Sequence, residues 1–235
     1  QPGGGGAFGG KSEPFDLEFC VAKLAMKTGR PVKILYTREE VFYAHRGRHP
    51  ALMWVRSAWK RDGTLTALHF RAFLDGGAYA SYGAATTYYA GALQPVTYRM
   101  EAYRYEGVRV FTNKPPCGPK RGHGTPQPRF ALEVHLDKVA EALNVDPVTL
   151  RRKNLMSSYQ RTVNHLRVTT CGLQQCLETV VRASNFLERH RRLPFGQGVG
   201  LAVSGFLCGS AAAIHWGELD HSQVCVSCDR HGAVR

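Results

Sequence analysis

Two glycine-rich loops hold the residues best suited to binding an electron-rich or anionic ligand. The first glycine loop (residues 3–11) contains six glycines and one bulky residue, Phe8. Glycine lets backbone N–H groups approach a ligand closely and adopts positive φ angles without strain. A helix is predicted directly after the loop, and a helix N-terminus favours negative charge. The pattern predicts a site made of backbone amides, with Phe8 as one wall.

The second glycine loop (residues 117–127) follows the same logic. Its glycines expose the backbone, while Arg121, His123 and Gln127 add side-chain donors and one titratable ring. It belongs to a long stretch without periodic structure, and such stretches inside a domain are usually functional. One loop of this kind is most often plain surface. Two of them, each followed by a predicted helix, favour a shared cofactor site at which the loops converge.

A dinucleotide site is an alternative interpretation of the first glycine loop. Gly4, Gly6 and Gly9 fit the fingerprint of a nicotinamide-dependent oxidoreductase, and an arginine, Arg38, follows the next predicted strand. The fingerprint requires a strand immediately before the glycines. Only two residues precede them here, and the second glycine loop then has no role.

The cysteines do not form a persuasive metal site. The chain has seven, and an odd number without an evident leader favours free thiols in a reducing compartment. Cys225 and Cys228 have the spacing of zinc ligands, but alternation along a strand would point them to opposite faces. We predict that both are small buried hydrophobes, and we assign no metal ligand.

The formal charge of +13 raises the possibility of a nucleic-acid partner. No interleaved aromatic residues accompany the basic stretch, as a stacking surface would require. We therefore expect an interface or a solvated surface, no nucleic acid, no membrane span and a cytoplasmic location. The basic residues concerned are Arg151, Arg152, Lys153, Arg161, Arg167, Arg182, Arg189, Arg191 and Arg192.

Hydrophobic periodicity predicts an α+β fold in two linked subdomains, residues 1–157 and 158–235, with both ends truncated. A turn at Arg61-Asp62-Gly63 between two alternating runs predicts a hairpin. The stretch 75–93 is rich in glycine and alanine and yields no assignment. The predicted helices are 14–28, 128–143, 146–155 and 173–187, and the predicted strands are 31–36, 52–59, 64–74, 102–111, 198–203 and 223–228, with a turn at His231-Gly232.

Six segments, in order along the whole chain, resemble the molybdenum-cofactor-binding subunits of the xanthine dehydrogenase and aldehyde oxidase family. Two of them are the glycine loops, GGAFGGK and RGHGTPQ. The segments are 5–11, 29–40, 45–50, 75–83, 121–127 and 144–155. Within that family, TNKPPCGPKRGHGT and GLQQCLE look closest to the large subunit of 4-hydroxybenzoyl-CoA reductase.

The resemblance implies molybdenum held by a pterin dithiolene, with or without a cytosine nucleotide, and not by protein side chains. It implies that amides near Ala7 and Phe8 face the cofactor and that Tyr89 faces the substrate. No residue here matches the family's catalytic glutamate, so none is assigned a catalytic role. The positions matched to cofactor-binding loops are Gly6, Ala7, Phe8, Gly9, Arg121 and Gly122.

The implied parent reaction is a two-electron oxidation or reductive dehydroxylation of an aromatic, aldehyde or thioester substrate. The implied partners are the rest of the subunit and iron–sulphur and FAD subunits or domains. We expect the chain alone to be inactive, and a non-catalytic remnant stays open as an alternative. Pro119 and Lys120 depart from the small and hydrophobic residues usual before the loop arginine, which puts cofactor affinity in question.

Overall fold

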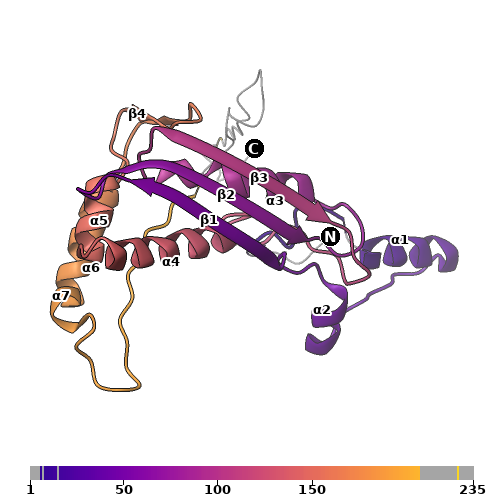
Figure 1. The fold of residues 1–235 in the computed structure, drawn as a ribbon. Helices are drawn as coiled ribbons and strands as arrows, with labels where there is room; N and C mark the ends of the chain where they lie inside the picture. The colour runs from indigo at the N-terminus through magenta and orange to yellow at the C-terminus, as the bar shows by residue number, and fades with distance from the viewer. Residues whose placement is uncertain (1–5, 7, 15, 207–226, 228–235) are drawn as a thin grey trace. The chain divides into compact units, whose positions relative to one another are not determined.

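The computed structural model describes residues 6, 8–14, 16–206 and 227, in a chain that divides into units 1–205 and 206–235. Every described helix and strand belongs to the first unit (Figure 1). In chain order they are α1 (Asp16–Thr28), α2 (Arg38–Ala44), β1 (Ala51–Trp59), β2 (Leu65–Asp75), α3 (Gly83–Ala92), η1 (Gln94–Val96), β3 (Ala102–Val110), α4 (Pro126–Ala142), α5 (Pro147–Asn154), β4 (Gln160–Arg161), β5 (Arg167–Val168), α6 (Leu173–Ala183) and α7 (Phe186–Arg189).

The centre of the fold is a three-stranded sheet in the order β1-β2-β3. β1 and β2 are antiparallel, which confirms the predicted hairpin, and β3 runs parallel to β2. The hairpin closes at Gly63, which has φ +82°, and Thr64 N–H donates to Asp62 Oδ1 at 3.0 Å. Burial alternates along β2, so one face of the sheet points into the core and the other is outward.

Helices α3 and α4 cover the inner face of the sheet. Phe70 of β2 stacks on Tyr105 of β3 beneath α3, with ring centroids 6.2 Å apart. On the same face, at the β1 edge of the sheet, Ser57 Oγ lies 2.7 Å from His135 Nε2 of α4. Figure 1 shows α4 running along the sheet towards α5. The second glycine loop leads directly into α4 and is therefore attached to this layer.

The core continues through α5, α6 and α7 into residues 199–203. Asp146 caps α5, because its Oδ1 accepts from the N–H groups of Val148 and Thr149 at 2.9 Å each. A buried carboxylate on α4, Glu133, accepts from Tyr98, Arg151 and the Val203 backbone. These bonds fix the C-terminal part of the first unit to α4.

Several predictions from the sequence were wrong or incomplete in detail. Residues 31–36 and 198–203 are not strands, because neither segment forms ladder hydrogen bonds with a strand in the described part of the chain. The unassigned stretch 75–93 contains α3. The predicted helix 173–187 is split by Asn185, whose backbone is left-handed at φ +49°.

The α+β class is confirmed. The predicted strand 223–228, its cysteine pair and the turn at His231-Gly232 lie outside the described residues. The proposed subdomain division at residue 157 is not tested by the structure and stays a prediction.

Candidate functional site

The first glycine loop has a strained, closely held backbone. Phe8 has φ +50° and Gly9 φ +100°, and the left-handed conformation is unusual for a residue with a bulky side chain. Such strain concentrates at binding and catalytic sites. Arg46, buried at 4% exposure, pairs with Glu13 at 2.5 Å and donates to the Gly10 carbonyl at 3.3 Å. Ala7, a predicted cofactor contact, lies outside the described residues.

The second glycine loop is attached to residues 45–50. The Gly118 N–H donates to the Gly47 carbonyl at 3.0 Å. Arg48 Nη2 donates to the Arg121 carbonyl at 2.7 Å, and Gln127 Nε2 donates to the His49 carbonyl at 2.9 Å. The segment 45–50 therefore supports both glycine loops, since Arg46 holds the first and Arg48 the second.

The two glycine loops lie in direct contact. A Cβ atom on Gly9 would stand 2.5 Å from the Pro119 carbonyl oxygen, so only glycine permits this approach. The Arg121 guanidinium carbon lies 5.4 Å from the centroid of the Phe8 ring, within cation–π range. The predicted convergence of the loops is thereby confirmed. The backbone N–H groups of Arg121 and Gly122 have no acceptor among the described residues.

Helix α3 presents an aromatic face to the second glycine loop. His123 lies 5.4 Å from Tyr89 between ring centroids, and its Nε2 is 2.7 Å from Thr86 Oγ1. Burial lowers the pKa of His123, although a backbone hydrogen bond to Tyr82 opposes the shift. Gly124 fits here because a Cβ would stand 2.5 Å from the Thr86 carbonyl oxygen. Tyr89 therefore lies beside the second glycine loop.

Two residues that the sequence did not single out, His49 and Arg109, are bonded to each other next to the segment 45–50. His49 is 2% exposed, and its Nε2 accepts from Arg109 Nε at 3.1 Å. Burial, together with the positive charge of Arg109, lowers the pKa of His49 to about 4. Arg109 Nη2 also donates to the Gly76 and Tyr79 carbonyls at 2.9 and 3.0 Å. The only signal in the sequence was the position of His49 within the HRGRHP segment.

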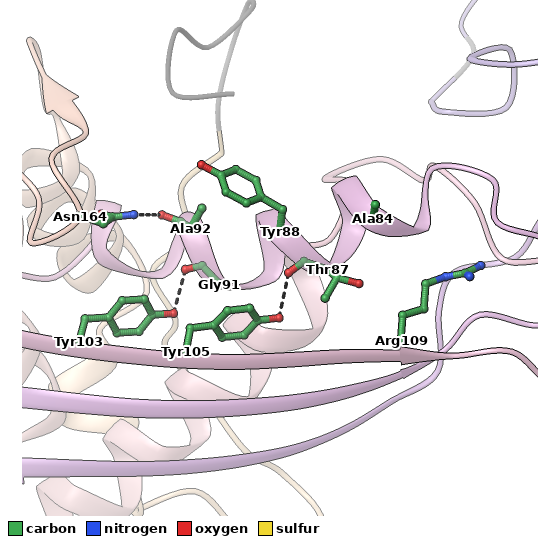
Figure 2. Close-up of a pocket in the computed structure, with 9 residues that line it drawn as sticks. All are labelled: Ala84, Thr87, Tyr88, Gly91, Ala92, Tyr103, Tyr105, Arg109 and Asn164. Carbon is green, nitrogen blue, oxygen red and sulfur yellow. Dashed lines mark hydrogen bonds between the residues drawn. The ribbon is translucent and has the colours of Figure 1, made fainter. Parts of the chain in front are cut away.

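A cavity of about 550 Å³ lies on the other side of α3, between this helix and β3 (Figure 2). Tyr103 and Tyr105 of β3 point towards the helix, and their hydroxyls donate to the Gly91 and Thr87 carbonyls. Tyr88 lines this cavity. Neither glycine loop contributes to its lining, so it is separate from the converged loops.

Part of the basic stretch 151–192 is used inside the fold. Arg151 is fully buried and pairs with Glu133 and Asp137, each at 2.8 Å. Arg152 pairs with Glu178 on α6 at 2.5 Å. These arginines join helices, so the cluster is not one continuous basic surface.

The described residues include no group of three or more His, Cys, Asp or Glu side chains close enough to hold a metal ion. In the same part of the chain, no helix combines the length and the apolar character needed to cross a bilayer.

Comparison with known proteins gives one consistent result. Residues 1–155 match the family described as "Molybdopterin cofactor-binding domain". The chain is 33% identical over 215 residues to the xanthine dehydrogenase molybdenum-binding subunit of Escherichia coli O157:H7, covering 90% of this chain and 28% of that protein. It is 36% identical over 150 residues to the nicotinate dehydrogenase large molybdopterin subunit of Eubacterium barkeri, covering 64% and 35% respectively.

The solved structure of aldehyde oxidoreductase from Desulfovibrio gigas is similar to the fold, with a TM-score of 0.74 at 31% identity. It is matched over 82% of this chain and 21% of that one. The chain spans only 27–29% of the first three curated relatives.

Proposed function

Because the chain belongs to the molybdopterin cofactor-binding domain family, we propose that its two glycine loops together bind a molybdenum–molybdopterin cofactor. The observation that carries the proposal is the contact of Gly9 with Pro119 and of Phe8 with Arg121. The proposed contacts are Gly6, Ala7, Phe8, Gly9, Arg121 and Gly122. The Rossmann alternative is disfavoured, because it leaves the second glycine loop without a role at this contact.

The residues present fit such a group. A pterin and its phosphate offer many hydrogen-bond acceptors, and the Arg121 and Gly122 amides have no acceptor in the described chain. A side chain on Gly9 would occupy the space where the loops meet. When bound, the cofactor would supply two-electron redox chemistry. This chain would supply fixed amide donors and the Phe8 wall, an arrangement that needs no reorganisation during the reaction.

The substrate would reach this site from the α3 side. Tyr89 and His123 stand together next to the second glycine loop. His123 is neutral at neutral pH, since burial lowers its pKa. We therefore propose that Tyr89 contacts substrate from a neutral, aromatic wall, which suits a planar aromatic or carbonyl compound better than a charged one.

The parent protein is, in this proposal, a longer molybdenum oxidoreductase of which the chain is a fragment. Its relatives include subunits named for xanthine and nicotinate dehydrogenases. We propose oxidation or reductive dehydroxylation of an aromatic, aldehyde or thioester substrate, with the 4-hydroxybenzoyl-CoA reductase type as the specific case. Iron–sulphur and FAD subunits would carry the electrons, the pterin could bear a cytosine nucleotide, and the location would be cytoplasmic.

Two glycine variants of the full-length subunit test cofactor binding. Both Gly9 and Gly29 have positive φ, so alanine strains the backbone at each position. Only at Gly9 would the new Cβ meet another loop, since nothing lies within 4 Å of it at Gly29. Gly9→Ala should therefore reduce bound molybdenum and pterin at least tenfold, whereas Gly29→Ala should retain both.

Metal analysis and pterin fluorescence of the folded variants provide the measurement. Equal cofactor contents in the two variants would contradict the proposal. A full-length protein that binds neither molybdenum nor pterin would favour the non-catalytic remnant instead.

A further inference from the structure

The outer edge of β3 is unpaired in the described part of the chain. β3 is the last strand of the sheet, and its nine residues align with β2 without a bulge. Natural sheets usually pair, cover or distort such an edge, because its free N–H and C=O groups attract other strands. No proline interrupts β3, and its Glu106 pairs with Arg104 at 2.8 Å and with Arg71 of β2 at 3.2 Å. This edge is therefore fit to accept another strand.

The cavity beside this edge is suited to an apolar side chain. Figure 2 shows Tyr103 and Tyr105 beneath α3, with both hydroxyls bonded to the helix backbone at 2.8 and 2.9 Å. At one end Asn164 Nδ2 donates to the Ala92 carbonyl at 2.9 Å. At the other end Arg109 is bonded to His49 and to two carbonyls. The Tyr103 and Tyr105 hydroxyls and the Asn164 amide are thus already bonded, which leaves mainly ring and methyl surface for a ligand in this part of the cavity.

The outward face of the sheet also favours an apolar side chain on the added strand. Leu52, Phe73 and Val108 form one row across the three strands and are 62%, 36% and 43% exposed. A fourth strand would place a side chain next to Val108 in that row. A strand with apolar residues on both faces would therefore bury the row on one side and fill the cavity on the other.

We infer that a strand from the parent polypeptide, outside these 235 residues, pairs with the outer edge of β3 and inserts an apolar side chain into the cavity. The inference rests on the proposal that the parent is a longer subunit. Its support is that relatives extend far beyond the matched part, of which this chain spans 27–29%. Backbone pairing would provide affinity, and the cavity would select the inserted residue.

Hydrogen–deuterium exchange in the full-length subunit tests this pairing. Relative to the 235-residue chain, amides in Ala102–Val110 should exchange at least tenfold more slowly. The β1 peptide Ala51–Trp59, at the opposite edge, should change much less and corrects for overall stability. Equal changes in the two peptides, or protection of β1 alone, would overturn the inference.

A matched pair of charge variants locates the contact. Ala84 and Ala183 are both exposed alanines on helices, but only Ala84 lines the cavity. In the full-length subunit Ala84→Glu should speed exchange in β3, because it places a carboxylate at the rim of the cavity that the apolar residue would enter. Ala183→Glu should not. Protection that persists in Ala84→Glu would contradict the insertion of an apolar side chain past this rim.

Two further measurements separate the alternatives. If the 235-residue chain dimerises in light scattering and Ala84→Glu abolishes the dimer, the edge belongs to a second copy and the inference is wrong. Molybdenum content is measured on the same full-length samples. Protection of β3 without bound molybdenum would support this inference while contradicting the proposed function.

Discussion

Glu133→Gln should destabilise the fold far more than Glu178→Gln, although each removes one carboxylate paired with an arginine of α5. Glu133 is 4% exposed and its partner Arg151 is fully buried. One Glu133 oxygen accepts from Arg151 Nε at 2.8 Å and from Val203 N–H at 2.9 Å. The other accepts from the Tyr98 hydroxyl at 2.7 Å. The amide keeps the shape but replaces one acceptor with a donor and leaves the arginine undercompensated.

The expected loss in the free energy of unfolding depends on how deeply each ion pair is buried. Breaking one partner of a buried ion pair typically costs about 3–5 kcal/mol. Asp137 lies 2.8 Å from Arg151 Nη1 and still compensates it, but its side chain is 52% exposed. We therefore expect a loss near the lower end, about 3 kcal/mol. The pair Arg152–Glu178 is 39% and 45% exposed, and such surface pairs contribute about 0–1 kcal/mol.

Urea denaturation followed by circular dichroism measures both effects on the 235-residue chain. With a slope of about 2 kcal/mol per molar urea, Glu133→Gln should lower the midpoint by roughly 1.5 M. Glu178→Gln should lower it by no more than about 0.5 M. Equal shifts in the two variants would refute the view that this buried network, and not charge alone, stabilises the fold.

Two other predictions concern His49 and Lys120. Burial beside Arg109 lowers the pKa of His49 to about 4, so between its ordinary pKa and this value only the unfolded chain takes up the proton. The unfolding free energy should therefore fall as the pH drops from about 6.5 to about 4. His49→Gln should flatten this decline in urea titrations, and an unchanged slope would show that other groups cause it. Lys120→Met in the full-length subunit should leave the molybdenum content within about twofold of the unchanged protein. Lysine normally keeps its charge in water, and Arg121 already supplies a cation at the loop. A larger loss of molybdenum would indicate that Lys120 contacts a phosphate.

The amino-acid sequence by itself determined the local structure and the family resemblance. Alternating apolar residues on either side of Arg61-Asp62-Gly63 specified the hairpin, because strand periodicity and turn chemistry are local properties. Asp146 followed by Pro147 likewise specified the start of α5. The two glycine loops could be selected because glycine frequency and the following helix signals are visible without coordinates.

Only the tertiary structure decided how these parts meet. Residues 31–36 have the composition of a strand but pair with no strand among the described residues, and a strand exists only where a neighbour supplies hydrogen bonds. The contact of Gly9 with Pro119, the bond from Arg109 to His49 and the cavity beneath α3 join residues far apart in the sequence. No local pattern encodes such contacts, because they depend on the angle at which α3 and α4 pack on the sheet. The sequence therefore identifies the two glycine loops of the candidate site, and the packing of helices on the sheet decides that they meet.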